Sequence, residues 1–271
     1  VLGVIGESGC GKSTLGRLLV RLERCSAGCI SLNGRDMETL YRTDRLAFRR
    51  STQMVFQNPF DTFDPRHSIG KILIGAMRLH RIGANDDERR ERALQVLSDA
   101  GLLPAESFLS RFPHELSGGQ LQRISILRSM LLHPAVIVAD EPVSMLDVSI
   151  RADIMNLLYE TSRRENTAMV FISHDITTTR YISNSIAVMY LGRIVEIADS
   201  ETLFQCPLHP YTISLLSAVP MPDPTVKMNR TILQGDLPSP SNPPKGCKFC
   251  TRCPECKQIC REKAPVFREY E

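Results

Sequence analysis

Short apolar runs alternate with amphipathic stretches along most of this chain. Runs without polar alternation lie at residues 1–5, 53–57, 136–139 and 168–172. Such runs are typical of strands buried on both faces of a parallel sheet. Residues 86–100 instead place apolar positions on one helical face and charges on the other. The alternation of strands and helices predicts an α/β fold with a mostly parallel sheet.

An all-helical stretch interrupts this alternation at about residues 68–133, and we expect it to be a subdomain inserted into the α/β core. Single helices are expected at residues 15–22 and 40–50. Another is expected after Asp147, whose carboxylate can cap the helix that it precedes. Residues 28–34 predict an edge strand that ends in an Asn-Gly turn.

The character of the sequence changes after about residue 200. The last two strands, paired as a hairpin, are predicted within residues 185–197. Nine of the 17 prolines then fall between Pro207 and Pro244, and proline-rich segments are stiff and extended rather than part of a core. We therefore predict a core domain over residues 1–200 and a small accessory domain over residues 201–271.

Composition excludes several classes of protein. Of the 271 residues, 42% are hydrophobic and 23% are charged, which is ordinary globular usage. The net charge of +3 is too small to indicate nucleic acid or anionic lipid as a partner. No apolar run reaches the roughly 18 residues that a membrane span needs, and no segment has the pattern of a secretory signal peptide. We expect a cytoplasmic protein, and, because the chain opens inside a core strand, a fragment.

The strand at residues 1–5 leads into a glycine-rich loop that a helix follows. The loop has the spacing G-x-x-x-x-G-K-S/T of a phosphate-binding loop, and its residues are Gly6, Glu7, Ser8, Gly9, Cys10, Gly11, Lys12, Ser13 and Thr14. Its glycines allow backbone N–H groups to converge on phosphate oxygens, and the helix N-terminus adds partial positive charge. We expect Lys12 to reach the β- and γ-phosphates and the Ser13 hydroxyl to ligate Mg²⁺.

Two carboxylates follow the apolar run at residues 136–139, at the end of a strand where open α/β sheets place their ligands. Asp140 would hold Mg²⁺, directly or through water. Glu141 could orient and deprotonate an attacking water. A second small-residue turn, Leu116-Ser117-Gly118-Gly119-Gln120, opens a helix that runs to about Leu132, and its amides and the Ser117 hydroxyl form another potential anion site.

The order of these motifs resembles that of the ATP-binding cassette (ABC) ATPases. The motifs are the phosphate loop, Gln57 at the end of a strand, Leu116 to Gln120, Asp140-Glu141, Leu146-Asp147 and His174. The resemblance covers nearly the whole chain. It implies a P-loop NTPase core of the RecA-like type with an inserted helical subdomain and a small cysteine-containing C-terminal extension, and ATP and Mg²⁺ as cofactors.

The resemblance also implies a role for each motif. Gln57 resembles the residue that senses the γ-phosphate and Mg²⁺ and contacts the membrane partner. Leu116 to Gln120 resemble the signature motif, which binds the γ-phosphate of an ATP held by the opposite subunit. Asp147 resembles the residue that bridges the two subunits near the reaction centre, and His174 the switch histidine on the γ-phosphate. The expected catalytic residues are then Lys12, Gln57, Glu141 and His174.

A physical argument agrees with a two-subunit site. The chain carries two phosphate-facing helix starts but one lysine-serine loop. If each site needs one of each, two chains must face each other head to tail. ATP would then hold the two chains together, and its hydrolysis would release them.

Four further segments, at residues 112–115, 142–144, 209–212 and 238–247, resemble the dipeptide and oligopeptide importers. Among these the chain is similar to the second, F-type, of two paired ATPase subunits. The resemblance implies a paralogous ATPase subunit as partner, with a homodimer as the alternative, and two membrane permease subunits. An extracytoplasmic peptide-binding protein would act indirectly. The expected location is the cytoplasmic face of the membrane, and the adenine-stacking residue would precede residue 1.

A cysteine cluster lies near the C-terminus, at Cys247, Cys250, Cys253, Cys256 and Cys260. The last four have the spacing C-x₂-C-x₂-C-x₃-C of bacterial iron–sulfur ligands, and zinc is the rival metal. The resemblance matches three of them, Cys247, Cys253 and Cys260, to cysteines of related importers, some of which carry an iron–sulfur cluster there. We expect a 4Fe–4S cluster, with Zn²⁺ as the alternative and free thiols as a third reading.

Other functions remain open at this stage. The cargo could be nickel or another solute, because such importers share similar ATPases. The chain could also be a non-transport ABC ATPase that acts on DNA or ribosomes, although its weak net charge argues against this. A subunit that binds ATP without turnover is a third alternative, and the intact Glu141 and His174 argue against it.

Overall fold

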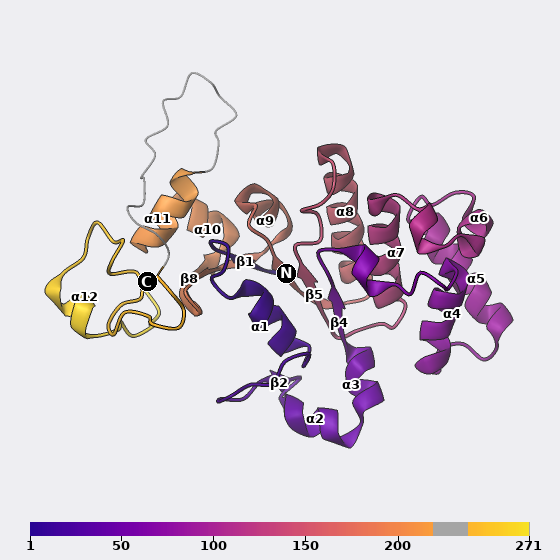
Figure 1. Ribbon diagram of the computed structural model, residues 1–271, viewed down its shortest axis with the longest axis horizontal. Coiled ribbons are helices and arrows are strands. Elements are labelled where there is room, and N and C mark those ends of the chain that lie inside the picture. The colour runs from indigo at the N-terminus through magenta and orange to yellow at the C-terminus, as the bar shows by residue number, and fades with distance from the viewer. Residues whose placement is uncertain (219–237, 271) are drawn as a thin grey trace. The chain divides into compact units, whose positions relative to one another are not determined.

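The computed structural model describes residues 1–218 and 238–270 (Figure 1). The chain divides into two compact units, one made of Val1–Leu15 with Phe171–Glu271 and the other of Gly16–Val170. We call them the first and the second unit. Part of the predicted accessory domain, residues 219–237, lies outside the described residues, and the boundary near residue 200 stays a prediction.

The first unit is built on three strands. Strand β1 (Leu2–Ile5) pairs in parallel with β7 (Ser185–Tyr190), and β7 pairs antiparallel with β8 (Arg193–Asp199). This confirms the predicted hairpin. Its two turn residues, Leu191 and Gly192, have φ of 44° and 76°, and positive φ at both positions matches the twist of the flanking strands.

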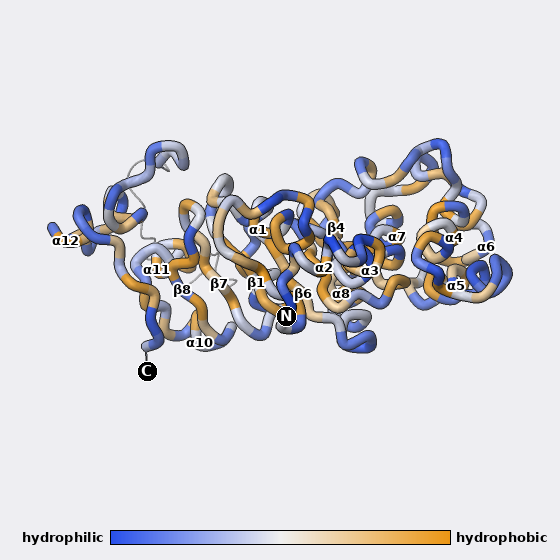
Figure 2. The backbone as a smooth tube through the Cα atoms, turned by 90° about the horizontal axis from the view of Figure 1, so that it is seen from below, coloured by the Kyte–Doolittle hydropathy of each residue, from blue (hydrophilic) through white to orange (hydrophobic). Residues whose placement is uncertain are grey.

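Helices α9, α10, α11 and α12 complete the first unit, at Ile176–Ile182, Ser200–Gln205, Pro210–Ser217 and Gln258–Glu262. The side chains of β1 and β7 are mostly buried, whereas those of β8 are largely exposed, and Figure 2 shows the hydrophobic character of β1. A three-ring cluster of Tyr190, Tyr211 and Phe249 extends this core, with ring centroids 4.7 to 5.4 Å apart. Edge-to-face contacts of this kind stabilise buried aromatic side chains. The cluster fixes α11 and the C-terminal segment to β7.

The second unit contains the parallel pair β4 (Thr52–Val55) and β5 (Val136–Asp140). Strand β6 (Ala168–Ile172) and helix α1 (Lys12–Leu19) each run across the division between the units. The larger helical part of the second unit consists of α4 (Ile69–Leu79), α5 (Asp86–Asp99), α6 (Ala105–Ser110), α7 (Gly118–Met130) and α8 (Val148–Arg164), with short 3₁₀ turns at Pro59–Thr62 and Pro113–Glu115. The strong amphipathic signal at residues 86–100 predicted α5 correctly.

Helices α4 to α7 pack against one another as one helical group (Figure 1). Their shared core consists of fully buried apolar side chains, among them Ile69, Leu73, Met77, Ala93, Leu97, Leu121 and Ile124. The group spans the all-helical stretch that the sequence indicated, because each helix buries one apolar stripe against its neighbours.

Two local expectations are wrong in detail. The single helix expected at residues 40–50 is two helices, α2 (Met37–Thr43) and α3 (Arg45–Ser51). Asp44 separates them: its extended backbone ends α2 through an N–H bond to the Leu40 carbonyl, and its carboxylate accepts from the Ala47 N–H to begin α3. One short polar residue thus stops one helix and caps the next. The edge strand expected at residues 28–34 is only the two-residue β2 (Ser31–Leu32), paired with β3 (Arg35–Asp36) around the predicted Asn-Gly turn.

The described part of the chain includes no helix with both the length and the apolar character needed to cross a bilayer.

Candidate active site

The phosphate loop joins β1 to α1 and packs closely on the β7–β8 hairpin. Gly6 has φ of +154°, and a Cβ there would lie 2.2 Å from the Met189 carbonyl oxygen. The Cys10 carbonyl accepts a hydrogen bond from the Gly192 N–H at 2.8 Å. Only glycine allows this close approach of two backbones. The first glycine of the motif is therefore required by packing as well as by its positive φ.

The side chain of Lys12 folds back into the phosphate loop. Its Nζ donates to the Gly6 carbonyl at 2.8 Å and to the Glu7 carbonyl at 3.1 Å, and the residue is only 6% exposed. Two backbone carbonyls thus hold the Lys12 ammonium in place next to the converging N–H groups. The buried Cys10 thiol lies beside it, and burial raises the pKa of that thiol.

Glu7, the second loop residue, is held by two residues from far along the chain. Its backbone N–H donates to the Tyr211 hydroxyl at 2.8 Å. Its carboxylate forms a bidentate ion pair with Arg252, at 2.6 and 3.0 Å. Sequence reasoning did not single out Arg252 or assign a role to Tyr211. The available signal was the presence of a carboxylate inside a phosphate-binding loop.

His174 belongs to the same unit as the phosphate loop and is exposed. The N–H of the preceding Ser173 donates to the Val4 carbonyl at 3.2 Å, so the segment begins beside β1. Asp175 then caps α9 by accepting from the Thr178 N–H. His174 is therefore set at the end of a buried strand, between two backbone anchors.

In the second unit, Gln57 and Glu141 are brought together. The Gln57 side-chain amide donates to the Glu141 carboxylate at 3.1 Å. Asp140, the last residue of β5, is 7% exposed. Glu141 has φ of +47°, which is costly for a residue with a side chain and persists only where the surroundings enforce it. The Ser144 hydroxyl and backbone N–H both donate to the Glu141 carbonyl, at 3.0 and 3.3 Å, and hold the turn that follows it.

The Ser-Gly-Gly turn begins α7 with a capping box. The Ser117 hydroxyl accepts from the Gln120 N–H at 3.3 Å, and the Gln120 side chain accepts from the Ser117 N–H at 3.1 Å. The next residue, Leu121, is fully buried in the helical core, which fixes the rotation of α7. The turn is a well-formed helix N-terminus, where the first backbone N–H groups have no partner within the helix itself.

Asp147 stands at the N-cap position of α8 but makes no side-chain capping bond. The expected capping role is therefore wrong. The nearby Arg151 instead donates to the Leu146 carbonyl at 2.9 Å, which fixes the turn without the aspartate. The Asp147 carboxylate is exposed.

The cysteine cluster does not assemble a metal site. Within residues 1–218 and 238–270, no three histidine, cysteine, aspartate or glutamate side chains are grouped so that they could hold a metal ion. The expected iron–sulfur or zinc site thus has no support in the structure. Burial raises the pKa of the Cys250 and Cys253 thiols.

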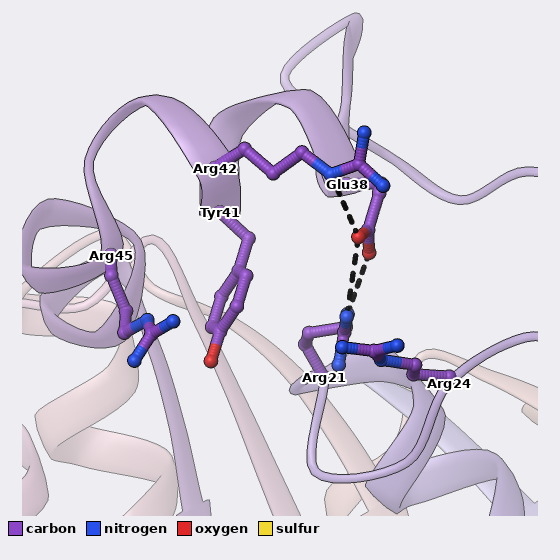
Figure 3. Close-up of a pocket in the computed structure, with 6 residues that line it drawn as sticks. All are labelled: Arg21, Arg24, Glu38, Tyr41, Arg42 and Arg45. Atoms are coloured by element: carbon purple, nitrogen blue, oxygen red, sulfur yellow. Dashed lines mark hydrogen bonds and ion pairs between the residues drawn. The ribbon is translucent and has the colours of Figure 1, made fainter.

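The second unit also carries an arginine-lined cavity of about 270 Å³ (Figure 3). Glu38 accepts hydrogen bonds from Arg21 and Arg42 there, and the guanidinium carbons of Arg21 and Arg45 lie 4.7 and 5.0 Å from the centroid of the Tyr41 ring. The Arg21 pair lowers the pKa of Glu38. None of the predicted site residues lines this cavity. Its lining residues come from the segment after α1 and from α2 and α3.

A buried strand, a loop folded around its lysine and a helix define a P-loop NTPase. Residues 1–144 match the family model described as ABC transporter, and residues 195–260 match the one described as oligopeptide/dipeptide transporter, C-terminal region. The chain belongs to the ABC transporter family and is an ATPase of that family, as the resemblance implied.

Two relatives and one solved structure illustrate the similarity. The chain is 47% identical to the oligopeptide transport ATP-binding protein AppF of Bacillus subtilis, over 99% of this chain and 82% of that protein. It is 44% identical to OppF of Escherichia coli K12, with the corresponding shares 98% and 80%. A dimeric post-hydrolysis structure of the ATP-binding cassette MJ0796 with ADP and Pi matches with a TM-score of 0.64 and 28% identity, covering 73% of this chain and 84% of that one.

Proposed function

We propose that this protein is the ATP-binding and ATP-hydrolysing subunit that energises import of dipeptides or oligopeptides through a membrane ABC transporter. The observation that carries the proposal is the hydrogen bond from Gln57 to Glu141. It links the glutamine expected to sense the membrane partner to the carboxylate expected to activate water. The match of residues 195–260 to the C-terminal region of peptide transporters supports a peptide cargo.

Each site residue has a proposed role in hydrolysis. Bound ATP and Mg²⁺ supply the phosphoryl group and the charge that stabilises its transfer. From the loop, Lys12 holds the β- and γ-phosphates and Ser13 offers a hydroxyl to Mg²⁺. Asp140 offers a carboxylate of the kind that Mg²⁺ binds. Glu141 orients water and accepts its proton.

Gln57 and His174 are proposed to respond to the γ-phosphate. Gln57 is also proposed as a Mg²⁺ ligand through its side-chain oxygen. Since its nitrogen donates to Glu141, that oxygen is the atom left for a metal. Any change in γ-phosphate or metal occupancy would then change the position of the Glu141 carboxylate.

The proposed assembly contains a second ATPase subunit, either a paralogue or another copy, and two permease subunits. The Ser117 turn and Asp147 face the nucleotide of the opposite subunit, and an extracytoplasmic peptide-binding protein acts through the permeases. The protein then lies at the cytoplasmic face of the membrane. We also propose residues 201–271 as an accessory domain of this subunit.

Reconstitution tests the cargo. The complex in proteoliposomes should hydrolyse ATP faster when its binding protein and a dipeptide or oligopeptide are present inside, and Glu141→Gln should abolish the stimulated rate. Stimulation by nickel or a sugar but not by peptides would contradict the proposed cargo. Unstimulated turnover together with recovery of nucleic acid would favour a non-transport ATPase.

Sedimentation tests the assembly. With ATP, the Glu141→Gln variant should sediment as a dimer, alone or with its paralogue, and return to monomer when ATP is removed. A chain that stays monomeric at high concentration with both partners would contradict the two-subunit site.

A further inference from the structure

Glu7 places a negative charge inside a loop that binds phosphate. Its carboxylate is about one-third exposed, whereas the Arg252 side chain that pairs with it is only 8% exposed. The two N–O distances of 2.6 and 3.0 Å make a bidentate pair, which fixes orientation as well as charge. The ion pair raises the pKa of Arg252, so this guanidinium stays protonated. Arg252 therefore cancels the charge of Glu7 at the loop.

Tyr211 holds the backbone of the same residue. Its hydroxyl accepts from the Glu7 N–H at 2.8 Å, and its ring is fully buried. The Glu7 N–H is thereby directed to a protein oxygen, and the loop's later N–H groups remain for phosphate. Both the side chain and the backbone of Glu7 are thus fixed by residues beyond position 200.

The groups that hold Glu7 are themselves rigidly supported. Phe249, 1% exposed, packs between Tyr190 and Tyr211. The Cys247 N–H donates to the Cys260 carbonyl at 2.8 Å, and a Cβ at Gly246 would lie 2.3 Å from that oxygen. The C-terminal segment therefore folds back on itself and presents Arg252 from a fixed backbone.

The start of α11 is anchored as well. Glu196 on β8 accepts from the N–H groups of Leu208 and His209 at 2.8 and 2.9 Å. His209 then caps the helix by accepting from the Tyr211 N–H at 3.1 Å. Tyr211 consequently has little freedom to follow the loop if the loop moves.

We propose that Arg252 and Tyr211 are positioning residues of the phosphate loop, and that the segment around Arg252 sets the affinity of the site for ATP. Arg252 removes the repulsion between the Glu7 carboxylate and the triphosphate, and Tyr211 fixes the path of the loop backbone. This inference rests on the proposed function of the loop, but not on the cargo or on the partner subunits.

A charge cycle on the full-length chain tests the role of Arg252. Arg252→Gln should weaken binding of a non-hydrolysable ATP analogue about tenfold, because an unpaired carboxylate then faces the phosphates. The double variant Glu7→Gln with Arg252→Gln should recover at least about threefold of that loss, because the repelling charge is gone. A purely structural arginine would give no recovery. Equal weakness in the single and double variants, or wild-type affinity in Arg252→Gln, would overturn the proposal.

A tyrosine pair tests the backbone contact. Tyr211→Phe keeps the ring and removes the hydroxyl, and should raise the KM for ATP about three- to tenfold with kcat within about twofold. Tyr270→Phe is the control, since it removes the same hydroxyl from a tyrosine that is 72% exposed and lies outside this cluster. Equal KM values for the two variants would contradict the role of Tyr211. Normal results here with no peptide-stimulated ATPase would contradict only the proposed cargo.

Discussion

The Gln57 side-chain amide lies 3.1 Å from the Glu141 carboxylate, although 84 positions separate the two residues. The strand register explains the contact. Val55, at the end of β4, is opposite Ala139 on the parallel strand β5. Gln57 and Glu141 each lie two residues further on, so two parallel strands deliver them to the same edge of the sheet.

This contact predicts how the pH dependence of hydrolysis changes when the amide becomes a carboxylate. Gln57→Glu places a second carboxylate beside Glu141, and repulsion between them raises the pKa of the pair. The acidic limb of the kcat profile should therefore move to higher pH. Gln57→Ala, which removes the hydrogen bond without adding charge, should lower kcat without that shift. An unshifted limb in Gln57→Glu would show that Glu141 is not the group whose ionisation limits the rate.

A comparison of two serine N-caps can distinguish the loss of a nucleotide contact from the loss of helix stability. Ser117 caps α7 and Ser68 caps α4 through the same hydroxyl-to-N–H geometry, at 3.3 and 3.4 Å. Replacing either by alanine should cost about 1 kcal/mol of folding free energy. If Ser117 binds the opposite subunit's ATP, only Ser117→Ala should also slow hydrolysis in the assembled complex, by at least about tenfold. Thermal denaturation and ATPase rates of the two variants measure the two effects, and equal ATPase rates would remove Ser117 from the site.

Alanine variants at two glycine positions can distinguish the cost of a backbone clash from the cost of torsional strain. At Gly6, alanine would bring Cβ within 2.2 Å of the Met189 carbonyl, whereas at Gly34, with φ of +75°, it would meet nothing within 4 Å. Gly34→Ala should cost about 1–2 kcal/mol, the price of a positive φ alone. Gly6→Ala should cost more than about 3 kcal/mol, because two backbones must separate. Denaturant unfolding measures both; similar values would mean that the loop is not tightly packed on β7.

The sequence contained enough information to predict the buried strands, the helical group and the position of the glycine-rich loop between β1 and α1. Their apolar runs and glycine spacings are local, and burial against neighbours preserves local patterns. Helix ends were harder to predict: Asp44 divides one expected helix because its carboxylate caps the second half, a choice that periodicity does not reveal. Asp147 shows the reverse error, since a residue at the N-cap position need not form the capping bond.

The support of the phosphate loop could not be predicted from the sequence. Glu7 and Arg252 are 245 positions apart, and no periodicity connects them. Their contact depends on how Phe249 packs between two tyrosines from other elements. The cysteine spacing predicts a metal site only if the fold groups the ligands, and within residues 1–218 and 238–270 no such group is present.

The ring of His209 predicts how stability changes with pH. Burial lowers the pKa of His209 below the ordinary value of 6.5, although the nearby Glu196 acts in the opposite direction. Its Nδ1 accepts the Tyr211 N–H and can do so only when unprotonated. The unfolded chain therefore takes up the proton first as the pH falls. The contribution of His209 to stability is complete above about pH 6.5 and is lost as the pH falls through the lower, folded-state pKa.

Asparagine at this position provides the test, since it caps helices through an oxygen that does not titrate. The melting temperature of His209→Asn should fall less between pH 7.5 and pH 5.5 than that of the wild type. Some pH dependence should remain, because burial also lowers the pKa of His80. His114→Asn, a change at an exposed histidine of the second unit, should behave as the wild type does. An equal fall in His209→Asn and the wild type would mean that folding does not lower the pKa of His209, and that the cap of α11 does not depend on its protonation.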